Sequence, residues 1–205
     1  MHIYGLEIEL DKDIYEPSED TFLTIDTAKE LINISKDITI LDMGTGTGII
    51  GLYLSTLSNV KEVVLADRLD EALELAKKNY YLNKGLVKAN LRFVKSNLFS
   101  NIKDKFDIIV FNTPYIPCNR LEIRKFGIIA YSWCGGNDGS RVAIRFLNKV
   151  NDYINKDSYI ILTTSSIANQ AKINSAIKRN NLKIIKENKI AYPSESIISK
   201  VITKV

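Results

Sequence analysis

The sequence LDMGTGTGIIG, at residues 41–51, is the stretch that decides the predicted fold. It overlaps a run of apolar and β-branched residues at 38–43 that predicts a buried strand, and it continues into a run at 49–57 that predicts a helix. Because glycine has no Cβ, a glycine-rich loop turns tightly and lets its backbone approach a nucleotide. The pattern predicts a nucleotide-binding loop, with Gly44, Gly46 and Gly48 as cofactor-binding residues.

Strand and helix patterns alternate along the rest of the chain. Further strands are predicted at 62–67, 91–94, 106–111 and 159–164, and helices at 18–31, 70–83, 140–153 and 167–179. This alternation predicts a parallel sheet with helices on both faces. Two strand patterns in succession, at 182–192 and 195–204, predict one antiparallel strand near the C-terminus. We therefore expect an α/β fold of the class I (Rossmann-like) methyltransferase type, with a mostly parallel seven-stranded sheet.

The length of 205 residues suits a single domain over 1–205, in which residues 1–33 form an N-terminal extension and the first helix. In such a sheet the ligand binds at the carboxyl ends of the strands. Asp67 ends the strand after the glycine loop, 21 residues past Gly46, where a carboxylate can accept hydrogen bonds from both ribose hydroxyls.

The glycine spacing at residues 46, 48 and 51 also fits a dinucleotide fingerprint. Asp42 precedes the glycines, where a carboxylate suits a cationic amino group better than a pyrophosphate. Together with the polar motif described next, Asp42 favours S-adenosylmethionine as the cofactor.

A polar residue ends the buried strand at 106–111, and a proline-containing turn follows it: Asn112, Thr113, Pro114 and Tyr115. Methylation of a planar nitrogen needs two acceptors aimed at its two hydrogens. The side-chain oxygen of Asn112 and the backbone carbonyl of Thr113 can supply them. Pro114 fixes the turn, and Tyr115 can pack over the planar group. The four residues are our candidate catalytic residues, and the alternative is an ordinary capped strand end.

Composition excludes several other chemistries. The only histidine is His2, so catalysis by a histidine base is not expected. Two cysteines, Cys118 and Cys134, are too few for a structural zinc site, and we expect packing residues rather than a disulfide or a metal site. No apolar stretch is long enough to span a bilayer and no signal peptide is evident, so a cytoplasmic protein without membrane contact is expected. The net charge of +4 comes from scattered basic residues.

The chain resembles the HemK-like protein-glutamine N5-methyltransferases, most of all their eukaryotic and archaeal branch. The resemblance covers nearly the whole chain. It rests on YEPSEDTFL at 15–23, on the glycine loop with Asp67, and on AYSWCGGNDGSR at 130–141.

The resemblance implies methylation of the glutamine in the Gly-Gly-Gln motif of a class-1 translation termination factor. It also implies a small zinc-binding activator protein that pairs with the edge strand from Leu91 to Val94. Matching positions imply cofactor contacts at Thr21, Asp42, Gly44, Asp67, Asn97 and Leu98, and an amide-binding role for Asn112.

Two residues depart from the family pattern. Thr113 replaces a usual proline, and Asn97 replaces a usual aspartate that accepts a hydrogen bond from the adenine amino group. We therefore expect weaker cofactor binding than in relatives with aspartate. Two other functions remain open: methylation of an exocyclic amine of adenine or guanine, and a non-catalytic adaptor. Direct nucleic-acid binding is not expected, because the chain has no room for a target-recognition domain and is only mildly basic.

Overall fold

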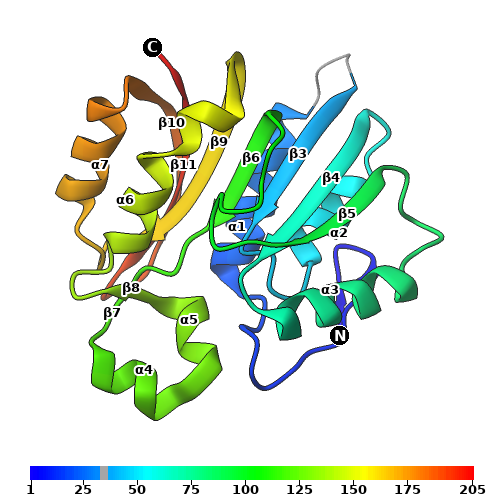
Figure 1. Cartoon of the computed structure of the whole chain (residues 1–205), viewed down its shortest axis with the longest axis horizontal. Helices are drawn as coiled ribbons and strands as arrows, with labels where there is room; N and C mark the ends of the chain where they lie inside the picture. The colour runs from blue at the N-terminus through cyan, green and yellow to red at the C-terminus, as the bar shows by residue number, and fades with distance from the viewer. Residues whose placement is uncertain (33–36) are drawn as a thin grey trace.

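The computed structural model describes residues 1–32 and 37–205, so residue 33, the expected end of the N-terminal extension, lies outside the described residues. Within these ranges seven strands form the main sheet, in the order β10-β11-β9-β6-β3-β4-β5 (Figure 1). The strands are β3 (Ile38–Met43), β4 (Val60–Asp67), β5 (Asn90–Lys95), β6 (Phe106–Asn112), β9 (Ile154–Ser165), β10 (Leu182–Ala191) and β11 (Ser196–Lys204). β11 runs antiparallel to both of its neighbours, and β9, β6, β3, β4 and β5 are parallel. The predicted sheet and its antiparallel strand are confirmed.

Helices cover both faces of this sheet, with α1 and α2 behind it and α6 and α7 in front (Figure 1). The helices are α1 (Glu19–Leu31), α2 (Ile49–Ser55), α3 (Asp70–Leu82), α6 (Arg141–Leu147) and α7 (Gln170–Arg179). Successive residues of a strand point to opposite faces. In β6, Ile108 and Val110 join the core under α1, α2 and α3, while Ile109 and Phe111 join the core under α6 and α7. Burial on both faces explains the uninterrupted apolar runs of the central strands.

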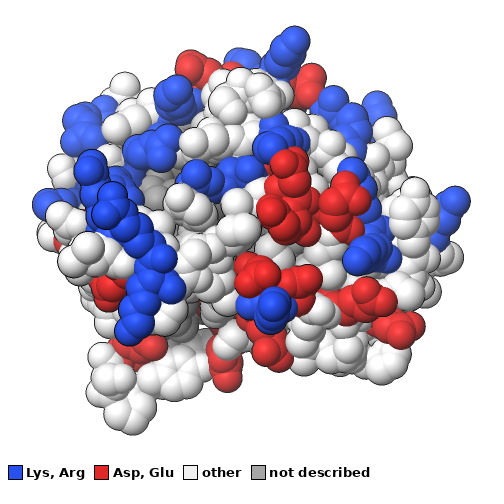
Figure 2. Space-filling model, turned by 60° about the horizontal axis from the view of Figure 1, so that its bottom comes forward, with Lys and Arg blue, Asp and Glu red and all other residues white. Residues whose placement is uncertain are grey.

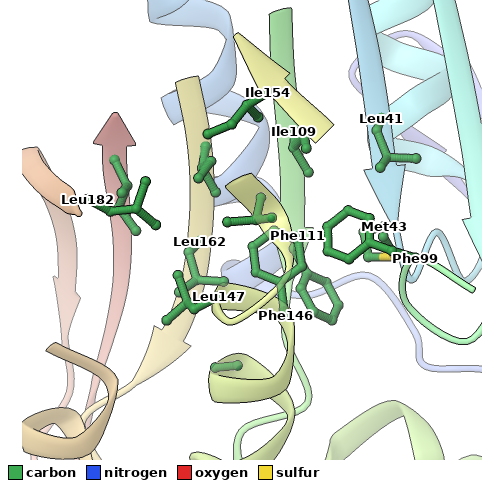
Figure 3. Packing of buried hydrophobic residues seen from close by; sticks show 14 of the residues in the cluster. Leu41, Met43, Phe99, Ile109, Phe111, Phe146, Leu147, Ile154, Leu162 and Leu182 are labelled. Carbon is green, nitrogen blue, oxygen red and sulfur yellow. The ribbon is translucent and has the colours of Figure 1, made fainter. Parts of the chain in front are cut away.

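Aromatic rings fill the core between β6 and α6 (Figure 3). The ring of Phe146 lies 5.2 Å from that of Phe99 and 5.1 Å from that of Phe111, between ring centroids. Phe111 immediately precedes Asn112, and Met43 in the same cluster immediately precedes Gly44. This packing therefore fixes the ends of β3 and β6, where both candidate motifs begin.

Two parts of the chain contain elements that the sequence pattern did not predict. β1 (His2–Ile3) and β2 (Leu6–Glu7) form a short antiparallel hairpin. After β6 the chain forms β7 (Ile116–Pro117), α4 (Arg120–Phe126), a 3₁₀ turn (Gly127–Ile129), α5 (Ala130–Trp133) and β8 (Cys134–Gly136), at the lower left of Figure 1. Elements of two to seven residues are too short to show a hydrophobic period.

Element boundaries differ most around residues 140–160. In place of the single helix predicted at 140–153, the structure has α6, which ends at Leu147, and a separate 3₁₀ turn (Val150–Tyr153). The following strand was predicted to begin at Tyr159, but β9 begins at Ile154. Its extra residues are tied down by Ser158, whose hydroxyl donates to the Phe106 carbonyl at 2.7 Å. Tertiary contacts of this kind leave no periodic signal in the sequence.

Candidate active site

The glycine loop joins the carboxyl end of β3 to α2, as predicted. Gly46 has a φ of +55° and Gly48 a φ of +86°, both in the left-handed region that favours glycine. A Cβ at Gly48 would lie 2.9 Å from the Cβ of Ala76, so this glycine also lets α2 approach α3. Gly44 and Gly46 line a cavity of about 200 Å³, whereas Gly48 lies behind its wall. The cavity lies at the edge of the sheet where the strands end.

The carboxylate of Asp67 faces this loop from the end of β4. One oxygen accepts from the backbone N–H of Gly46 at 3.1 Å, and the other accepts from the N–H of Leu69 at 3.0 Å. Burial raises the pKa of Asp67, against the lowering effect of these backbone donors. Asp67 lines the cavity together with Asn97 and Leu98.

Leu98 has a strained backbone, with a φ of +53° that is unusual for a side chain of its size. The hydroxyl of Ser96 donates to the Leu98 carbonyl and stabilises this turn. The turn brings Asn97 and Leu98 to the cavity directly after β5. Sequence reasoning placed both residues at the site but did not predict the strain.

Asp42, in contrast, lies beneath the loop rather than in the cavity wall. Its side chain is fully buried, and its Oδ2 accepts from the hydroxyl of Thr45 at 2.5 Å and from the N–H of Gly51 at 2.9 Å. Its Oδ1 is buried without a hydrogen-bond partner among the described residues. Burial raises the pKa of Asp42 to about 7 in spite of the two donors. Asp42 thus fixes the loop, and it retains one unpaired acceptor.

Asn112 ends β6 at the other side of the cavity, and it is one of the residues that line the cavity. The side-chain oxygen is buried and accepts no hydrogen bond from the described residues. An unpaired buried acceptor costs about 1–3 kcal/mol, and such groups in native proteins call for an explanation. A donor group on a bound molecule would satisfy this oxygen.

The backbone turn after Asn112 is held by β9. Both the N–H and the hydroxyl of Thr113 donate to the carbonyl of Thr163, at 3.1 and 2.8 Å. A proline at this position has neither donor. Thr113 therefore has its own means of fixing the turn where the family usually has proline.

The glycine-rich segment after α5 packs directly on this turn. A Cβ at Gly135 would lie 2.7 Å from the Pro114 carbonyl oxygen, and a Cβ at Gly139 would lie 2.2 Å from that of Tyr115. β8 of this segment pairs with β7. Both glycines are needed for the close backbone approach, so the segment that the resemblance singled out supports the candidate catalytic turn.

The N-terminal segment closes the site from the side of α1. Thr21 is buried and lines the cavity, and both its N–H and its hydroxyl donate to Asp20, at 2.6 and 3.2 Å. The hydroxyl of Tyr115 donates to the same carboxylate at 3.0 Å. Thr21, a predicted cofactor residue, and Tyr115, a predicted catalytic residue, thus both donate to the Asp20 carboxylate. The sequence alone did not indicate a role for Asp20.

A second contact that the sequence did not predict joins two residues that line the cavity. The guanidinium of Arg68 lies 4.0 Å from the ring centroid of Tyr131, a cation–π contact between the end of β4 and α5. Both residues line the cavity, as does Trp133. In the sequence, Arg68 directly follows Asp67, and Tyr131 and Trp133 lie in the stretch at 130–141 that the resemblance singled out. Nothing else in the sequence indicated a place for them at the site.

The expectation about the cysteines was wrong, because Cys118 and Cys134 form a disulfide, with Cα atoms 5.5 Å apart. They are brought together by the pairing of Ile116 in β7 with Cys134 in β8. Those strands were not predicted, so no sequence pattern indicated that the two residues would pair. The disulfide closes the segment that carries α4 and α5.

The fold and site define a class I methyltransferase, and comparison with known proteins agrees. Residues 24–122 match the family described as methyltransferase small domain. In solved structures, the Mtq2–Trm112 complex of E. cuniculi, described as methylating the eRF1 termination factor, includes a chain with this fold. The TM-score is 0.67, at 24% identity over 94% of this chain and 99% of that one.

Two curated relatives narrow the class to a family. A putative protein N5-glutamine methyltransferase of Methanocaldococcus jannaschii is 29% identical over 97% of this chain and 95% of its own length. The eRF1 methyltransferase catalytic subunit of Schizosaccharomyces pombe is 30% identical over 71% of this chain and 70% of its own length. The chain belongs to the HemK-like protein-glutamine N5-methyltransferases, in their eukaryotic and archaeal branch.

Basic and acidic side chains share the face around the site. Figure 2 turns the carboxyl ends of the strands toward the viewer, with Lys and Arg more frequent on the left and Asp and Glu at the centre and right. This face is not uniformly basic.

In residues 1–32 and 37–205, no helix has the length and apolar character needed to cross a membrane.

Proposed function

We propose that this chain transfers a methyl group from S-adenosylmethionine to the side-chain amide nitrogen of a glutamine, in the Gly-Gly-Gln motif of a class-1 termination factor. The position of Asn112 carries this proposal, because the residue ends β6 at the cavity and its side-chain oxygen has no partner among the described residues, which leaves it as an acceptor for a substrate amide N–H. The names of the relatives give the class of substrate. A termination factor as substrate implies action in the cytoplasm.

Several features of the cavity suit S-adenosylmethionine. Asp67 ends β4 and lines the cavity, the position from which a carboxylate binds ribose hydroxyls. Asp42 supports the cofactor loop from beneath, through its bonds to Thr45 and Gly51, and its carboxylate lies under the loop that the cationic amino group of the cofactor would approach. Thr21, Asn97 and Leu98 complete this half of the cavity. When bound, the cofactor supplies an electrophilic methyl group on a sulfonium.

The residues of the turn at 112–115 then act mainly by positioning. Asn112 accepts one amide hydrogen of the substrate, and the backbone carbonyl of Thr113 accepts the other. Both acceptors raise electron density on an otherwise delocalised nitrogen. Tyr115 lines the same cavity and packs against the planar amide. No histidine base is required in this scheme.

The test is a labelled-methyl assay with purified chain and a termination factor. Label should enter the factor, and replacing the glutamine of its Gly-Gly-Gln motif should abolish labelling. N112A should lower kcat/KM by roughly 100-fold or more while binding of S-adenosylmethionine stays within threefold. Labelling of nucleic acid, or no transfer to the factor with the activator present, would refute the proposal.

We further propose that a small activator protein adds a strand to β5. β5 is an edge strand of the sheet, and it carries Leu91 and Phe93. The opposite edge strand, β10, carries several lysines, the usual protection of an edge against pairing. Exposed apolar residues lie at the end of α3, which contacts β5, and in the loop that leads to β5: Tyr81, Leu82 and Leu86. The E. cuniculi relative, whose title names a complex with Trm112, supports a partner of this kind.

Matched variants test this second proposal. Leu86, in the loop before β5, and Ile185, on β10, are both 50% exposed. L86D should weaken binding of a zinc-binding activator by roughly tenfold or more, whereas I185D should leave it unchanged. Equal effects of the two variants in a co-purification or calorimetric assay would exclude β5 as the docking edge.

The alternative of an exocyclic amine in nucleic acid is not favoured. The curated relatives quoted above are named for protein glutamine or for a termination factor. The mixed charge around the site in Figure 2 also differs from the basic surface that phosphate binding requires.

A further inference from the structure

Asp20 binds both halves of the site through separate oxygens. Its Oδ1 accepts from the N–H of Thr21 at 2.6 Å and from the Thr21 hydroxyl at 3.2 Å. Its Oδ2 accepts from the hydroxyl of Tyr115 at 3.0 Å and from that of Tyr15 at 3.2 Å. Thr21 lies in the proposed cofactor half and Tyr115 in the proposed substrate half, 94 residues apart in sequence.

These contacts occur in a buried environment. Asp20 is 4% exposed, and it has no ion pair with a lysine, arginine or histidine among residues 1–32 and 37–205. Burial and the neighbouring Asp20 carboxylate raise the pKa of both Tyr115 and Tyr15. Both hydroxyls therefore remain protonated donors at neutral pH, and four donors compensate the buried carboxylate.

Tyr115 borders two separate spaces in the protein. It lines the cavity of the candidate active site, and it also lines a second hollow of about 310 Å³ that Tyr15, Tyr192 and Glu195 border. Tyr115 also packs against the core under α6 and α7. The hydrogen bond from the Tyr115 hydroxyl to Asp20 holds the ring between the two spaces.

We propose that Asp20 is a positioning residue for methyl transfer, holding Thr21 with one oxygen and Tyr115 with the other. This inference rests on the proposed function. Holding both residues at once explains why a carboxylate, and not an amide, is required at position 20. An ionised carboxylate accepts at both oxygens, whereas the amide of asparagine accepts at one end and donates at the other. Asparagine can keep the Thr21 N–H bond with its oxygen, but its NH₂ group then faces Tyr115 and Tyr15, whose hydroxyls can no longer donate to it.

The test compares wild type, D20N, Y115F and the double variant D20N/Y115F in the labelled-methyl assay. D20N should lower kcat/KM by roughly 10- to 100-fold, the range expected for a lost hydrogen bond to a charged group. In the Y115F background the same change should cost less than about threefold, because Asp20 then has no Tyr115 hydroxyl to hold. An equal factor in both backgrounds overturns the inference.

A matched control lies elsewhere on the same helix. The hydroxyl of Tyr4 donates to the Asp26 carboxylate at 2.9 Å, which is the same kind of bond on an exposed part of α1. D26N should leave kcat/KM within about twofold of wild type. If D26N lowers activity as much as D20N does, general destabilisation of α1 is the cause and the inference fails.

Failure of the inference is distinguishable from failure of the proposed function. A wild-type chain that does not methylate the termination factor refutes the function. A wild-type chain that is active while D20N equals it refutes only the role of Asp20. Should D20N not fold, Y115F and Y15F remove the two Oδ2 bonds separately. Y115F should then lower kcat/KM more than Y15F, and the reverse order overturns the inference.

Discussion

Replacing Asp42 by asparagine should stabilise the free protein, although Asp42 belongs to the proposed cofactor site. The asparagine side chain would keep an oxygen at the Oδ2 position, so the hydrogen bonds from Thr45 and Gly51 persist. Its NH₂ group would occupy the Oδ1 position, which has no partner among the described residues. The substitution therefore removes a buried charge without removing the two observed bonds.

The magnitude follows from the pKa. Burial raises the pKa of Asp42 from 3.8 to about 7. A carboxyl group with a raised folded-state pKa contributes stability below pH about 4, and that contribution is lost as the pH rises to about 7. A pKa difference of about three, at about 1.4 kcal/mol for each unit, corresponds to about 4 kcal/mol at most. The D42N variant has no carboxyl group at this position, so its free energy of unfolding does not fall in this way as the pH rises.

The assay is urea unfolding at a series of pH values, followed through the fluorescence of the single tryptophan, Trp133. D42N and wild type should have similar free energies of unfolding near pH 4. Above pH 7, D42N should be more stable, while it binds S-adenosylmethionine more weakly. A stability difference that does not grow between pH 4 and pH 7 would refute the reasoning.

Asp138 gives a control of opposite sign, because hydrogen bonds from Lys172 and Ser140 lower its pKa to about 2. Its stabilising contribution is present above pH about 4 and is lost as the pH falls toward 2. D138N should therefore be less stable than wild type at neutral pH, and this difference should shrink in acid.

Three further substitutions test the site. G48A should lower the free energy of unfolding by about 2–4 kcal/mol, through its left-handed φ and contact with α3, whereas G85A, which meets no atom within 4 Å, should change it little. N97D should tighten S-adenosylmethionine binding by roughly fivefold in calorimetry, because a carboxylate accepts more strongly than an amide, and an unchanged dissociation constant would contradict this. T113V should lower unfolding stability by about 1 kcal/mol through loss of the hydroxyl bond to β9, whereas T113S should retain it.

The sequence alone predicted the parts of the molecule that depend on local pattern. The apolar runs of β3 and β6 predicted strands buried on both faces, and the glycines after β3 predicted the loop. Asn112 was predicted as a site residue because it is polar and ends such a strand. In each case the physical cause, either a period of side-chain burial or the backbone freedom of glycine, is contained within a short stretch of chain.

The tertiary structure alone decided the contacts between distant residues. It placed the Tyr115 hydroxyl on Asp20 and the guanidinium of Arg68 over the ring of Tyr131. It also moved Asp42 from the cavity wall to the space beneath the loop. These positions depend on how α1 and the α4–α5 segment pack against the ends of the strands. No local pattern encodes that packing, because each contact joins side chains whose own stretches of sequence are compatible with many neighbours.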